Sequence, residues 1–197
     1  MNMLSSYKQF YKENYLYAPL FCEENIWHLI DSLSSADIAI KSLFCLFITN
    51  SKQKFIMLNQ QSAALNQAVI WDYHVILLAI IKQQAYIFDF DTRLDFVTPL
   101  EEYLIKSFIF SDQLAGQFVP YIRKIPAQSY LKQFYSDRSH MLNQISPSEF
   151  PPWPVINSAN KNYTSLADYL NLQKKIIDKN RLIKCDSLEH VMYGITL

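Results

Sequence analysis

The chain has 197 residues, of which 50% are hydrophobic and 18% charged, a composition typical of one well-packed globular domain. Lys plus Arg equals Asp plus Glu at 18 each, and no long basic run is present, which argues against a nucleic-acid partner bound through its phosphates. Only 2 glycines occur, so neither a P-loop nor a dinucleotide-binding fingerprint can be assembled.

The cysteines and the apolar runs indicate the compartment. Cys22, Cys45 and Cys185 are widely spaced and form no CxxC pair, which favours a reducing interior. No apolar run reaches about 18 residues, and the first residues do not resemble a signal peptide. We therefore expect a cytoplasmic monomer with no membrane partner, organised as one domain over residues 1–197 with an irregular leader over 1–19.

Residues 22–33 are predicted to form an amphipathic helix. Its apolar residues recur at helical spacing, and they are Ile26, Trp27, Ile30 and Leu33. Glu23 and Glu24 fall in the first turn, where acidic side chains suit the helix dipole. For these two residues a solvated first turn and a functional role are both open.

Cys22 stands at the start of this helix. There the first backbone N–H groups have no intrahelical partner and can stabilise a thiolate, whereas Glu23 and Glu24 oppose it if they point at the sulfur. A cysteine in such a place is by itself more often structural than nucleophilic. Its role therefore depends on its partners, above all on an imidazole near the sulfur.

The middle of the chain is predicted to form strands. Residues 41–50 and 54–58 are the first two candidates, and the polar loop 59–67 separates them from the strongest predicted strand, Val69–Ile81. A further strand over Tyr86–Phe90 follows after a short connection. The last two strands should therefore pair as an antiparallel hairpin.

Alternation within Val69–Ile81 assigns its side chains to two faces of the sheet. Asp72 and His74 share one face, and Trp71 and Tyr73 lie on the other. We therefore expect Trp71 and Tyr73 to point away from His74 and to act only as packing residues.

No internal repeat or linker is found in the chain. After residue 91 the sequence predicts a series of short elements, namely a helix over 101–110, a strand over 118–125, a short amphipathic segment over 128–135, a proline-rich loop over 146–154, a helix over 164–172 capped by Thr164 or Ser165, and a terminal strand over 191–197.

A cysteine at a helix start, followed by neighbouring strands that carry His74 and Asp89, is the arrangement of a cysteine amidase or acyltransferase. The thiolate attacks a carbonyl carbon, the imidazole takes and returns the proton, and the carboxylate fixes the imidazole tautomer. Taken alone, His74 is more often a structural histidine and Asp89 a strand-end cap. The combination favours the catalytic interpretation.

The register of the hairpin leaves the carboxylate open. A turn centred on residues 82–85 places Asp89 opposite Leu78, roughly 13 Å from His74 and too far for a hydrogen bond. A turn centred between residues 81 and 82 places Asp89 opposite His74. A turn spanning residues 81–84 places Asp91 there instead, so geometry alone keeps Asp91 as a competitor.

Four stretches carry a family resemblance: CEENIW at 22–27, VIWDYHV at 69–75, FDFDT at 88–92 and SYLKQFYSDRSHM at 129–141. Weaker matches are FITN at 47–50, QQ at 60–61 and PPWP at 151–154. Together they resemble the protein N-terminal glutamine amidohydrolase family, in the family's order and over most of the chain. The WDYH and SDRSHM blocks are the most specific.

The resemblance implies an α+β fold with a transglutaminase-like or papain-like core, in which an antiparallel sheet packs against a helix carrying the nucleophilic cysteine at its amino terminus. It also implies a triad of Cys22, His74 and Asp89, which ranks Asp89 above Asp91 and favours the earlier turn. Such enzymes convert the N-terminal glutamine of a protein to glutamate and release ammonia, and in eukaryotes this feeds degradation signals. The reaction passes through a thioester on Cys22 and requires no metal or organic cofactor.

An enzyme specific for a free N-terminus needs a group that recognises an ammonium, because an unpaired buried ammonium is costly. The acidic candidates near the expected pocket are Glu23, Glu24, Asp72 and Asp91. Further along, Asp137, Arg138 and His140 are pocket candidates, although an Asp137–Arg138 pair that holds a loop is the favoured interpretation. Cys45 and Cys185 are expected in the core.

Two other functions remain open at this point. One is a thiol enzyme of the same core that deamidates or crosslinks internal glutamine, which would not require a free α-amino group. The other is a binding module that recognises peptide N-termini without turnover, which would release no ammonia.

Overall fold

The computed structural model describes residues 9–35, 40–111, 114–156, 164–176 and 181–196. Residues 1–8 of the expected leader and Leu197 of the expected terminal strand lie outside this part. The described part of the leader contains a 3-10 turn at Lys12–Asn14. Further 3-10 turns lie at Gly116–Phe118, Ser139–Met141 and Pro147–Glu149.

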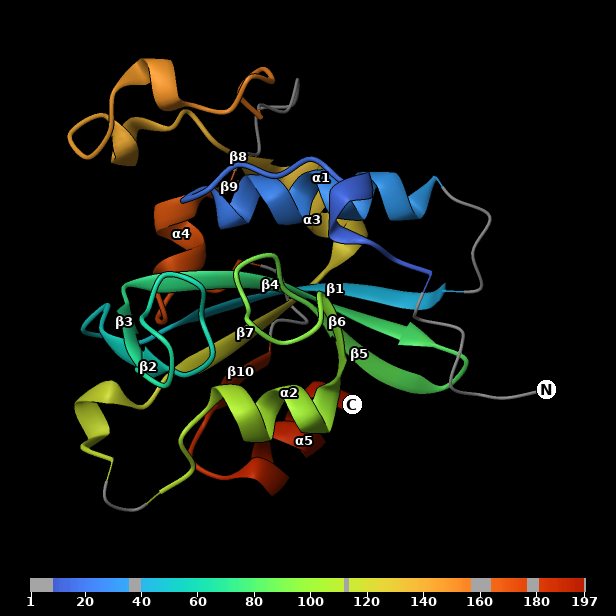
Figure 1. The fold of residues 1–197 in the computed structure, drawn as a ribbon, viewed down its shortest axis with the longest axis vertical. Coiled ribbons are helices and arrows are strands. Elements are labelled where there is room, and N and C mark those ends of the chain that lie inside the picture. The colour runs from blue at the N-terminus through green and yellow to red at the C-terminus, as the bar shows by residue number, and fades with distance from the viewer. Residues whose placement is uncertain (1–8, 36–39, 112–113, 157–163, 177–180, 197) are drawn as a thin grey trace.

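One six-stranded sheet, antiparallel at every step, forms the centre of the molecule (Figure 1). In order across the sheet its strands are β10 (Arg181–Lys184), β7 (Tyr121–Pro126), β1 (Ile40–Thr49), β4 (Tyr73–Ile81), β5 (Gln84–Phe88) and β6 (Val97–Pro99). Two small pairs accompany it, namely β2 (Phe55–Met57) with β3 (Val69–Trp71), and β8 (Phe134–Tyr135) with β9 (Thr164–Ser165).

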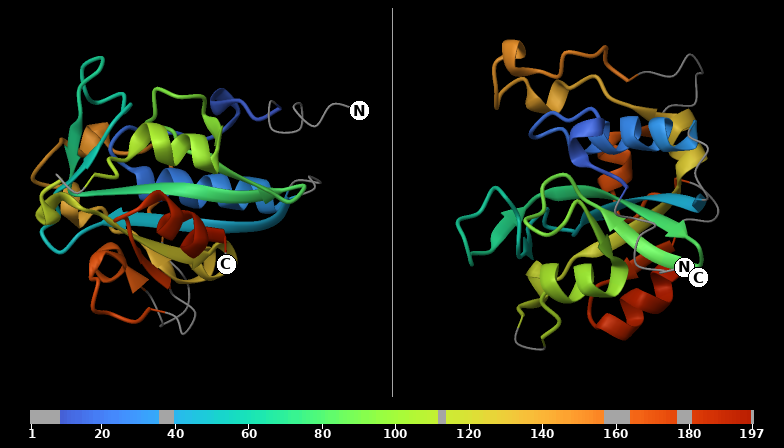
Figure 2. Two further views of the ribbon diagram at one scale, coloured as in Figure 1. Left: turned by 90° about the horizontal axis from the view of Figure 1, so that it is seen from below. Right: turned by 45° about the vertical axis from the view of Figure 1, so that its right-hand side comes forward.

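Helices cover both faces of this sheet, as Figures 1 and 2 show. On one face lie α1 (Cys22–Ser34), α3 (Ala127–Gln133) and α4 (Leu166–Leu170), and on the other α2 (Leu100–Ser107) and α5 (Leu188–Thr196). The expected α+β class with an antiparallel sheet is thereby confirmed. None of the described helices is long and apolar enough to cross a membrane.

The central strand β4 serves two cores because its side chains alternate between the faces of the sheet. Val75 and Leu77 pack in the cluster under α1, whereas Ile76 and Leu78 pack in the cluster under α2 and α5. The helix α1 contributes its apolar stripe to the first cluster, namely Ile26, Leu29, Ile30 and Leu33. Burial of each such side chain stabilises the fold by roughly 1.5–3 kcal/mol.

The β4–β5 hairpin has a two-residue turn at Lys82 and Gln83. Their φ angles are 47° and 70°, and two consecutive positive values are the geometry of a type I′ turn. Ile81 therefore pairs with Gln84, and the ladder continues to Leu77 opposite Phe88. This is the register of a turn spanning residues 81–84, so the expected turn centred between residues 81 and 82 was wrong.

The predicted strand Val69–Ile81 is in fact two strands. It breaks at Asp72, whose Oδ1 accepts a hydrogen bond from the backbone N–H of Tyr73 at 2.8 Å, while its carbonyl oxygen accepts one from the Thr49 hydroxyl at 2.8 Å. An aspartate that bonds the neighbouring backbone competes with a regular ladder. As a result β3 pairs with β2 outside the main sheet, and only β4 joins β1 and β5.

The terminal strand predicted over 191–197 was also wrong, because its described residues, 191–196, lie within α5. The Ser187 hydroxyl accepts a hydrogen bond from the backbone N–H of His190 at 3.2 Å, which is an N-cap interaction. Val191 and Ile195, four residues apart on one helical face, are buried against the sheet. The helical periodicity was present in the sequence, but the β-branched residues suggested a strand.

Other predicted elements match with shifted ends. The helices predicted over 101–110 and 164–172 correspond to α2 and α4, and Ser165 caps α4 in a capping box with Asp168. The strand predicted over 118–125 begins only at Tyr121.

Candidate active site

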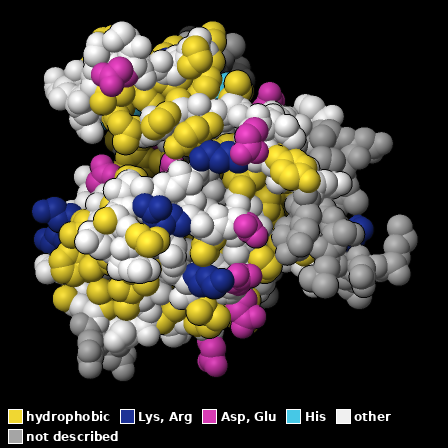
Figure 3. Space-filling view, in the orientation of Figure 1, with side chains coloured by type: hydrophobic (Ala, Val, Ile, Leu, Met, Phe, Trp, Pro, Cys, Tyr) yellow, Lys and Arg dark blue, Asp and Glu magenta, His cyan; other side chains and the backbone are white. Residues whose placement is uncertain are grey.

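A cavity of about 340 Å³ opens beside the start of α1. Five parts of the chain line it, namely the leader at 17–20 with Cys22, the loop at 61–62, residues 71–74, Asp91, and the segment 140–144. Its volume falls in the range of small-ligand sites. The segment that follows β8, residues 136–156, forms a lobe at the top of the view in Figure 1, called the upper lobe below. Figure 3 shows hydrophobic side chains gathered on this lobe. On the same face the Lys and Arg side chains are scattered and form no stripe.

Cys22 is the first residue of α1 and lines the cavity. The helix start has no side-chain cap, so its first N–H groups are not occupied by a capping side chain. The Asn25 side chain bonds both the N–H and the carbonyl oxygen of Ala18 at 2.8 Å, which holds the leader against the helix. Leu20 has a φ of 69°, so the chain turns sharply just before the cysteine.

The surroundings of Cys22 keep its thiol protonated. Burial raises the pKa of this thiol well above 9.0, and Glu23 and Asp91 raise it further, whereas a backbone hydrogen bond from Val75 lowers it. The sulfur lies 3.7 Å from Oε2 of Glu23. The helix start alone therefore does not produce a thiolate, and a base has to take the proton.

His74 and Asp89 form a buried pair. Nε2 of His74 lies 3.0 Å from Oδ1 of Asp89, and the two side chains are each 1% exposed. Burial lowers the pKa of His74, but the Asp89 carboxylate outweighs it and the net pKa is raised. Because Nε2 faces Asp89 and the residue lines the cavity, Nδ1 is the nitrogen left to exchange a proton there.

Three groups besides His74 donate hydrogen bonds to Asp89. Its Oδ2 accepts hydrogen bonds from the Tyr103 hydroxyl at 2.8 Å and from the Gln60 amide at 3.2 Å. Its Oδ1 accepts one from the backbone N–H of Asp91 at 2.9 Å. Burial raises the pKa of Asp89, but His74 and these donors outweigh it, so the net pKa is lowered and the carboxyl is ionised.

The pairing of His74 with Asp89 does not follow from the strand register. Extended past its end, the observed ladder would place Asp91 opposite His74, but the ladder stops at Phe88. The N–H of Asp89 then bonds the carbonyl oxygen of Phe96 at 3.1 Å, away from β4. Asp89 therefore reaches His74 as a diagonal neighbour across the strand pair, a distance that longer side chains can span.

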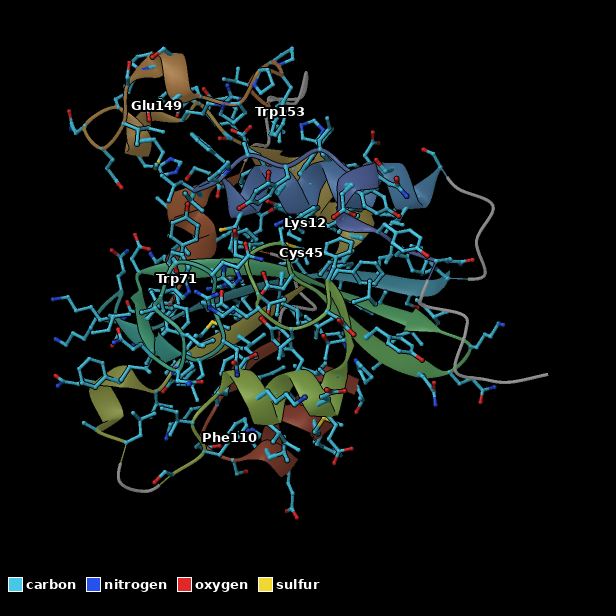
Figure 4. All side chains as sticks on the ribbon, viewed as in Figure 1. Lys12, Cys45, Trp71, Phe110, Glu149 and Trp153 are labelled. Atoms are coloured by element: carbon cyan, nitrogen blue, oxygen red, sulfur yellow. The ribbon has the colours of Figure 1, made fainter. Side chains whose placement is uncertain are left out.

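Trp71 and Tyr73 both line the cavity, so the expectation that they only pack away from His74 was wrong. The strand break at Asp72 turns the Trp71 ring onto His74, where the two rings stack at 5.5 Å with an angle of 8°. Figure 4 shows Trp71 beside β3 at one end of the sheet, and Cys45 between α1 and the sheet. Trp71 thus shields the imidazole on one side.

Glu23 and Glu24 are fully buried, so the solvated first turn was wrong for both. Oε2 of Glu23 accepts a hydrogen bond from the Tyr73 hydroxyl at 3.0 Å, and its Oε1 lies 3.5 Å from Nε2 of His140. Burial raises the pKa of Glu23 to about 7. Glu23 therefore contacts three residues that line the cavity, namely Cys22, Tyr73 and His140, but does not line it itself.

Glu24 points the other way, into an ion pair with Arg138 at 2.8 Å. It also accepts hydrogen bonds from the Ser136 hydroxyl at 2.8 Å and the Trp153 indole at 2.7 Å. Figure 4 shows Trp153 above α1, in the upper lobe. The expected Asp137–Arg138 pair is thus replaced by Glu24–Arg138, and Glu24 does not line the cavity.

Asp72 and Asp91 are the two carboxylates that line the cavity. Asp72 is exposed, whereas Asp91 is partly buried and its Oδ1 accepts a hydrogen bond from the Tyr17 hydroxyl at 2.7 Å. Cys45 and Cys185 are buried in the two cores, as predicted.

His74, Asp89 and Asp91 could also be considered for a metal, because one ligand atom from each lies within 4.8 Å of the others. However, both oxygens of Asp89 already accept hydrogen bonds from neighbouring residues. A metal ion would displace these donors, so the residues present fit an imidazole–carboxylate pair better than a metal site.

Three residues of this site were missed in the sequence, namely Tyr17, Gln60 and Tyr103. Gln60 stands in a motif noted only as a weak match, and its role depends on the bridge that pairs it with Thr92. Tyr17 and Tyr103 come from the leader and from α2, and neither has a local pattern that distinguishes it from a core tyrosine.

Comparison with known proteins identifies the family of this chain. The family model described as N-terminal glutamine amidase matches residues 17–192. The chain is similar to the protein N-terminal glutamine amidohydrolase of Homo sapiens, with 35% identity over 167 residues that cover 82% of this chain and 80% of the relative. Relatives of the same name are similar in Danio rerio (32% identity, covering 82% of this chain and 81% of the relative) and in Arabidopsis thaliana (29% identity, covering 78% and 74%).

Proposed function

Since the chain belongs to the N-terminal glutamine amidase family, we propose that it hydrolyses the side-chain amide of an N-terminal glutamine in proteins or peptides to glutamate and ammonia. The observation that carries this proposal is one cavity lined both by Cys22, at the start of α1, and by His74, which is paired with Asp89. The curated relatives bear the name of this activity, and the site contains the groups that the chemistry requires.

In the proposed mechanism His74 accepts the thiol proton as Cys22 attacks the glutamine δ-carbonyl carbon. The C–N bond then breaks, and the proton on His74 passes to the leaving nitrogen, which departs as ammonia. A γ-glutamyl thioester remains on Cys22. A water molecule gives its proton to His74 and attacks the thioester, which restores the thiol and releases glutamate.

The other groups support these steps. Asp89 fixes the tautomer of His74 and stabilises the imidazolium that forms, because its charge is held by Tyr103 and Gln60. The uncapped N–H groups at the start of α1 are suited to stabilise the oxyanion of each tetrahedral intermediate. None of these steps requires a metal or an organic cofactor.

We also propose that the core of this protein is related to the cores of transglutaminases and papain-like enzymes. It is supported by a cysteine at a helix start, packed on an antiparallel sheet that carries the histidine. The combination of helix and sheet in this order is shared by thiol enzymes of several activities. The activity therefore depends on which glutamine enters the cavity.

The test is ammonia release, with mass spectrometry of the product, from a Gln-initiated peptide, its N-acetylated form and a peptide with internal glutamine. We expect release from the first alone, and a loss of at least about 10³-fold in Cys22→Ala. Cys45→Ala is the matched control, since it removes the same sulfur from a buried core position.

The other outcomes separate the rival functions. Release from the internal glutamine would indicate a broader deamidase or a crosslinking enzyme. Binding of the Gln-initiated peptide without any release would indicate a module that recognises N-termini. Activity that survives in Cys22→Ala would contradict the assignment of the nucleophile.

A further inference from the structure

The cavity beside Cys22 is suited to a cation. Its lining contains the carboxylates of Asp72 and Asp91 but, among the described residues, no lysine or arginine. An α-amino group at a protein N-terminus has a pKa of about 8, so it is mostly charged at neutral pH. If the cavity receives an N-terminal residue, as the proposed function requires, one of its acidic groups has to meet that charge.

Asp91 is held in a fixed position at the cavity wall. Its Oδ1 accepts a hydrogen bond from the Tyr17 hydroxyl at 2.7 Å, and its backbone N–H donates to Oδ1 of Asp89 at 2.9 Å. The Tyr17 ring stacks on Phe90 with ring centres 5.4 Å apart, and Lys12 lies 4.1 Å above the Tyr17 ring. The same carboxylate of Asp89 thus orients both His74 and Asp91.

The charge of Asp91 is only partly compensated. Burial raises the pKa of Asp91 and Asp89 raises it further, and together they outweigh His74, Tyr17 and Lys12, which lower it. The nearby cation Lys12 donates its hydrogen bond to the carbonyl oxygen of Phe90 at 2.6 Å instead. The carboxylate of Asp91 is therefore available to accept a hydrogen bond from a substrate ammonium.

The spacing suits glutamine. A carboxylate oxygen of Asp91 lies within 4.8 Å of a ring nitrogen of His74. In an extended glutamine, the α-nitrogen lies roughly 5 Å from the side-chain carbonyl carbon. An ammonium held by Asp91 would consequently bring that carbon to the neighbourhood of His74, which lines the same cavity as Cys22.

The other acidic candidates are less suited to the substrate ammonium. Glu24 is paired with Arg138. Glu23 does not line the cavity and has no exposed surface. Its Oε2 accepts a hydrogen bond from Tyr73, and its Oε1, which has no hydrogen-bond partner among the described residues, lies 3.5 Å from Nε2 of His140. Asp72 is exposed, and its Oδ1 accepts a hydrogen bond from the neighbouring backbone N–H. Exposed ion pairs contribute little because water screens them.

We propose that Asp91, positioned by Tyr17, binds the α-ammonium of the substrate and thereby restricts the enzyme to free N-terminal glutamine. This inference rests on the proposed function, because it concerns the same cavity. It assigns Asp91 to substrate recognition rather than to the orientation of His74, which Asp89 performs.

Binding and turnover are measured separately in the test. Cys22→Ala lacks the proposed nucleophile, so calorimetry on this variant is expected to measure binding without turnover. It compares a Gln-initiated peptide with the same peptide whose α-amino group is replaced by hydrogen. We expect the amino group to tighten binding at least about tenfold in Cys22→Ala, and to have no effect once Asp91→Asn is added. Asp95→Asn is the matched control, because it removes the same charge from an exposed residue outside the cavity.

Each other result has a defined meaning. A preference for the amino group that persists in the Asp91→Asn background and disappears with Asp72→Asn would overturn the assignment in favour of Asp72. No preference in Cys22→Ala itself would overturn it entirely. Ammonia release by the unmodified enzyme tests the proposed function independently, so the two proposals can fail separately.

Discussion

At the scale of single residues, the site depends on which carboxyls are ionised. Asp89 is stabilised as a carboxylate by His74 and three further donors, whereas Glu23 is shifted the opposite way by burial. Both acids have an imidazole nearby, His74 beside Asp89 and His140 beside Glu23. The net pKa of His74 is raised, whereas burial lowers the pKa of His140, so only Asp89 has a partner that favours the charged form. In the proposed mechanism the two therefore have opposite effects, since Asp89 would support proton transfer to His74 and an ionised Glu23 would oppose thiolate formation.

This contrast predicts a pH-dependent effect of Glu23. Because its pKa is raised from 4.5 to about 7, Glu23 is neutral at pH 5 and ionised at pH 8. Above pH 7 its charge raises the pKa of Cys22, and Glu23→Gln removes that charge. We expect the pKa of the thiol to fall by on the order of one unit in the variant.

The check is the rate of Cys22 alkylation by iodoacetamide across pH, mapped by mass spectrometry. The variant should react faster than wild type around pH 8 and at a similar rate around pH 5. Glu13→Gln, at an exposed position of the leader, serves as the control. Superimposable profiles for wild type and Glu23→Gln would show that Glu23 does not act on the sulfur.

At the scale of elements, α1 is joined to the upper lobe by one buried ion pair. Glu24 on α1 accepts from Arg138, Ser136 and Trp153, all of which belong to the segment that follows β8. Arg138 also donates to the carbonyl oxygens of Pro151 and Trp153. The segment that supplies His140 to the cavity is therefore anchored to the helix that supplies Cys22.

Removal of this anchor should be strongly destabilising. Arg138→Met keeps much of the side-chain volume but leaves Glu24 buried without a counter-charge, and we expect a loss of about 3–5 kcal/mol in the free energy of unfolding. Urea denaturation measures it. Lys106→Met breaks the half-exposed pair with Glu102 and should cost at most about 1 kcal/mol. Equal losses in the two variants would contradict the importance of burial.

The elements also show how far sequence reasoning extends. The amphipathic period of α1 and the apolar character of β1 and β4 were sufficient to predict the helix and the central strands. The hairpin register was not predictable, because Lys82 and Gln83 adopt positive φ angles without the Gly or Asn that usually marks a type I′ turn. The break at Asp72 likewise depends on Thr49, a residue distant in sequence.

At the scale of the whole molecule, the cavity exists because distant segments meet at one end of the sheet. Cys22 comes from a helix on one face, whereas Tyr103, which holds Asp89, comes from a helix on the other. Sequence motifs led to the prediction of Cys22, His74 and Asp89, because these stand in specific local patterns; the structure pairs His74 with Asp89 and places Cys22 and His74 on one cavity. They did not identify Tyr17 or the stacking of Trp71 on His74, because both follow from tertiary packing.

In the proposed mechanism Cys22 carries the γ-glutamyl group between acylation of the thiol, which releases ammonia, and hydrolysis of the thioester. The most direct measurement is acid quenching within milliseconds of mixing with a Gln-initiated peptide, followed by intact and peptide mass spectrometry. We expect an adduct on Cys22 that increases the mass of the protein by the mass of the peptide minus that of ammonia. This adduct should decay as product forms. Ammonia release at full rate with no adduct on Cys22 at any time, under conditions that trap thioesters, would contradict it.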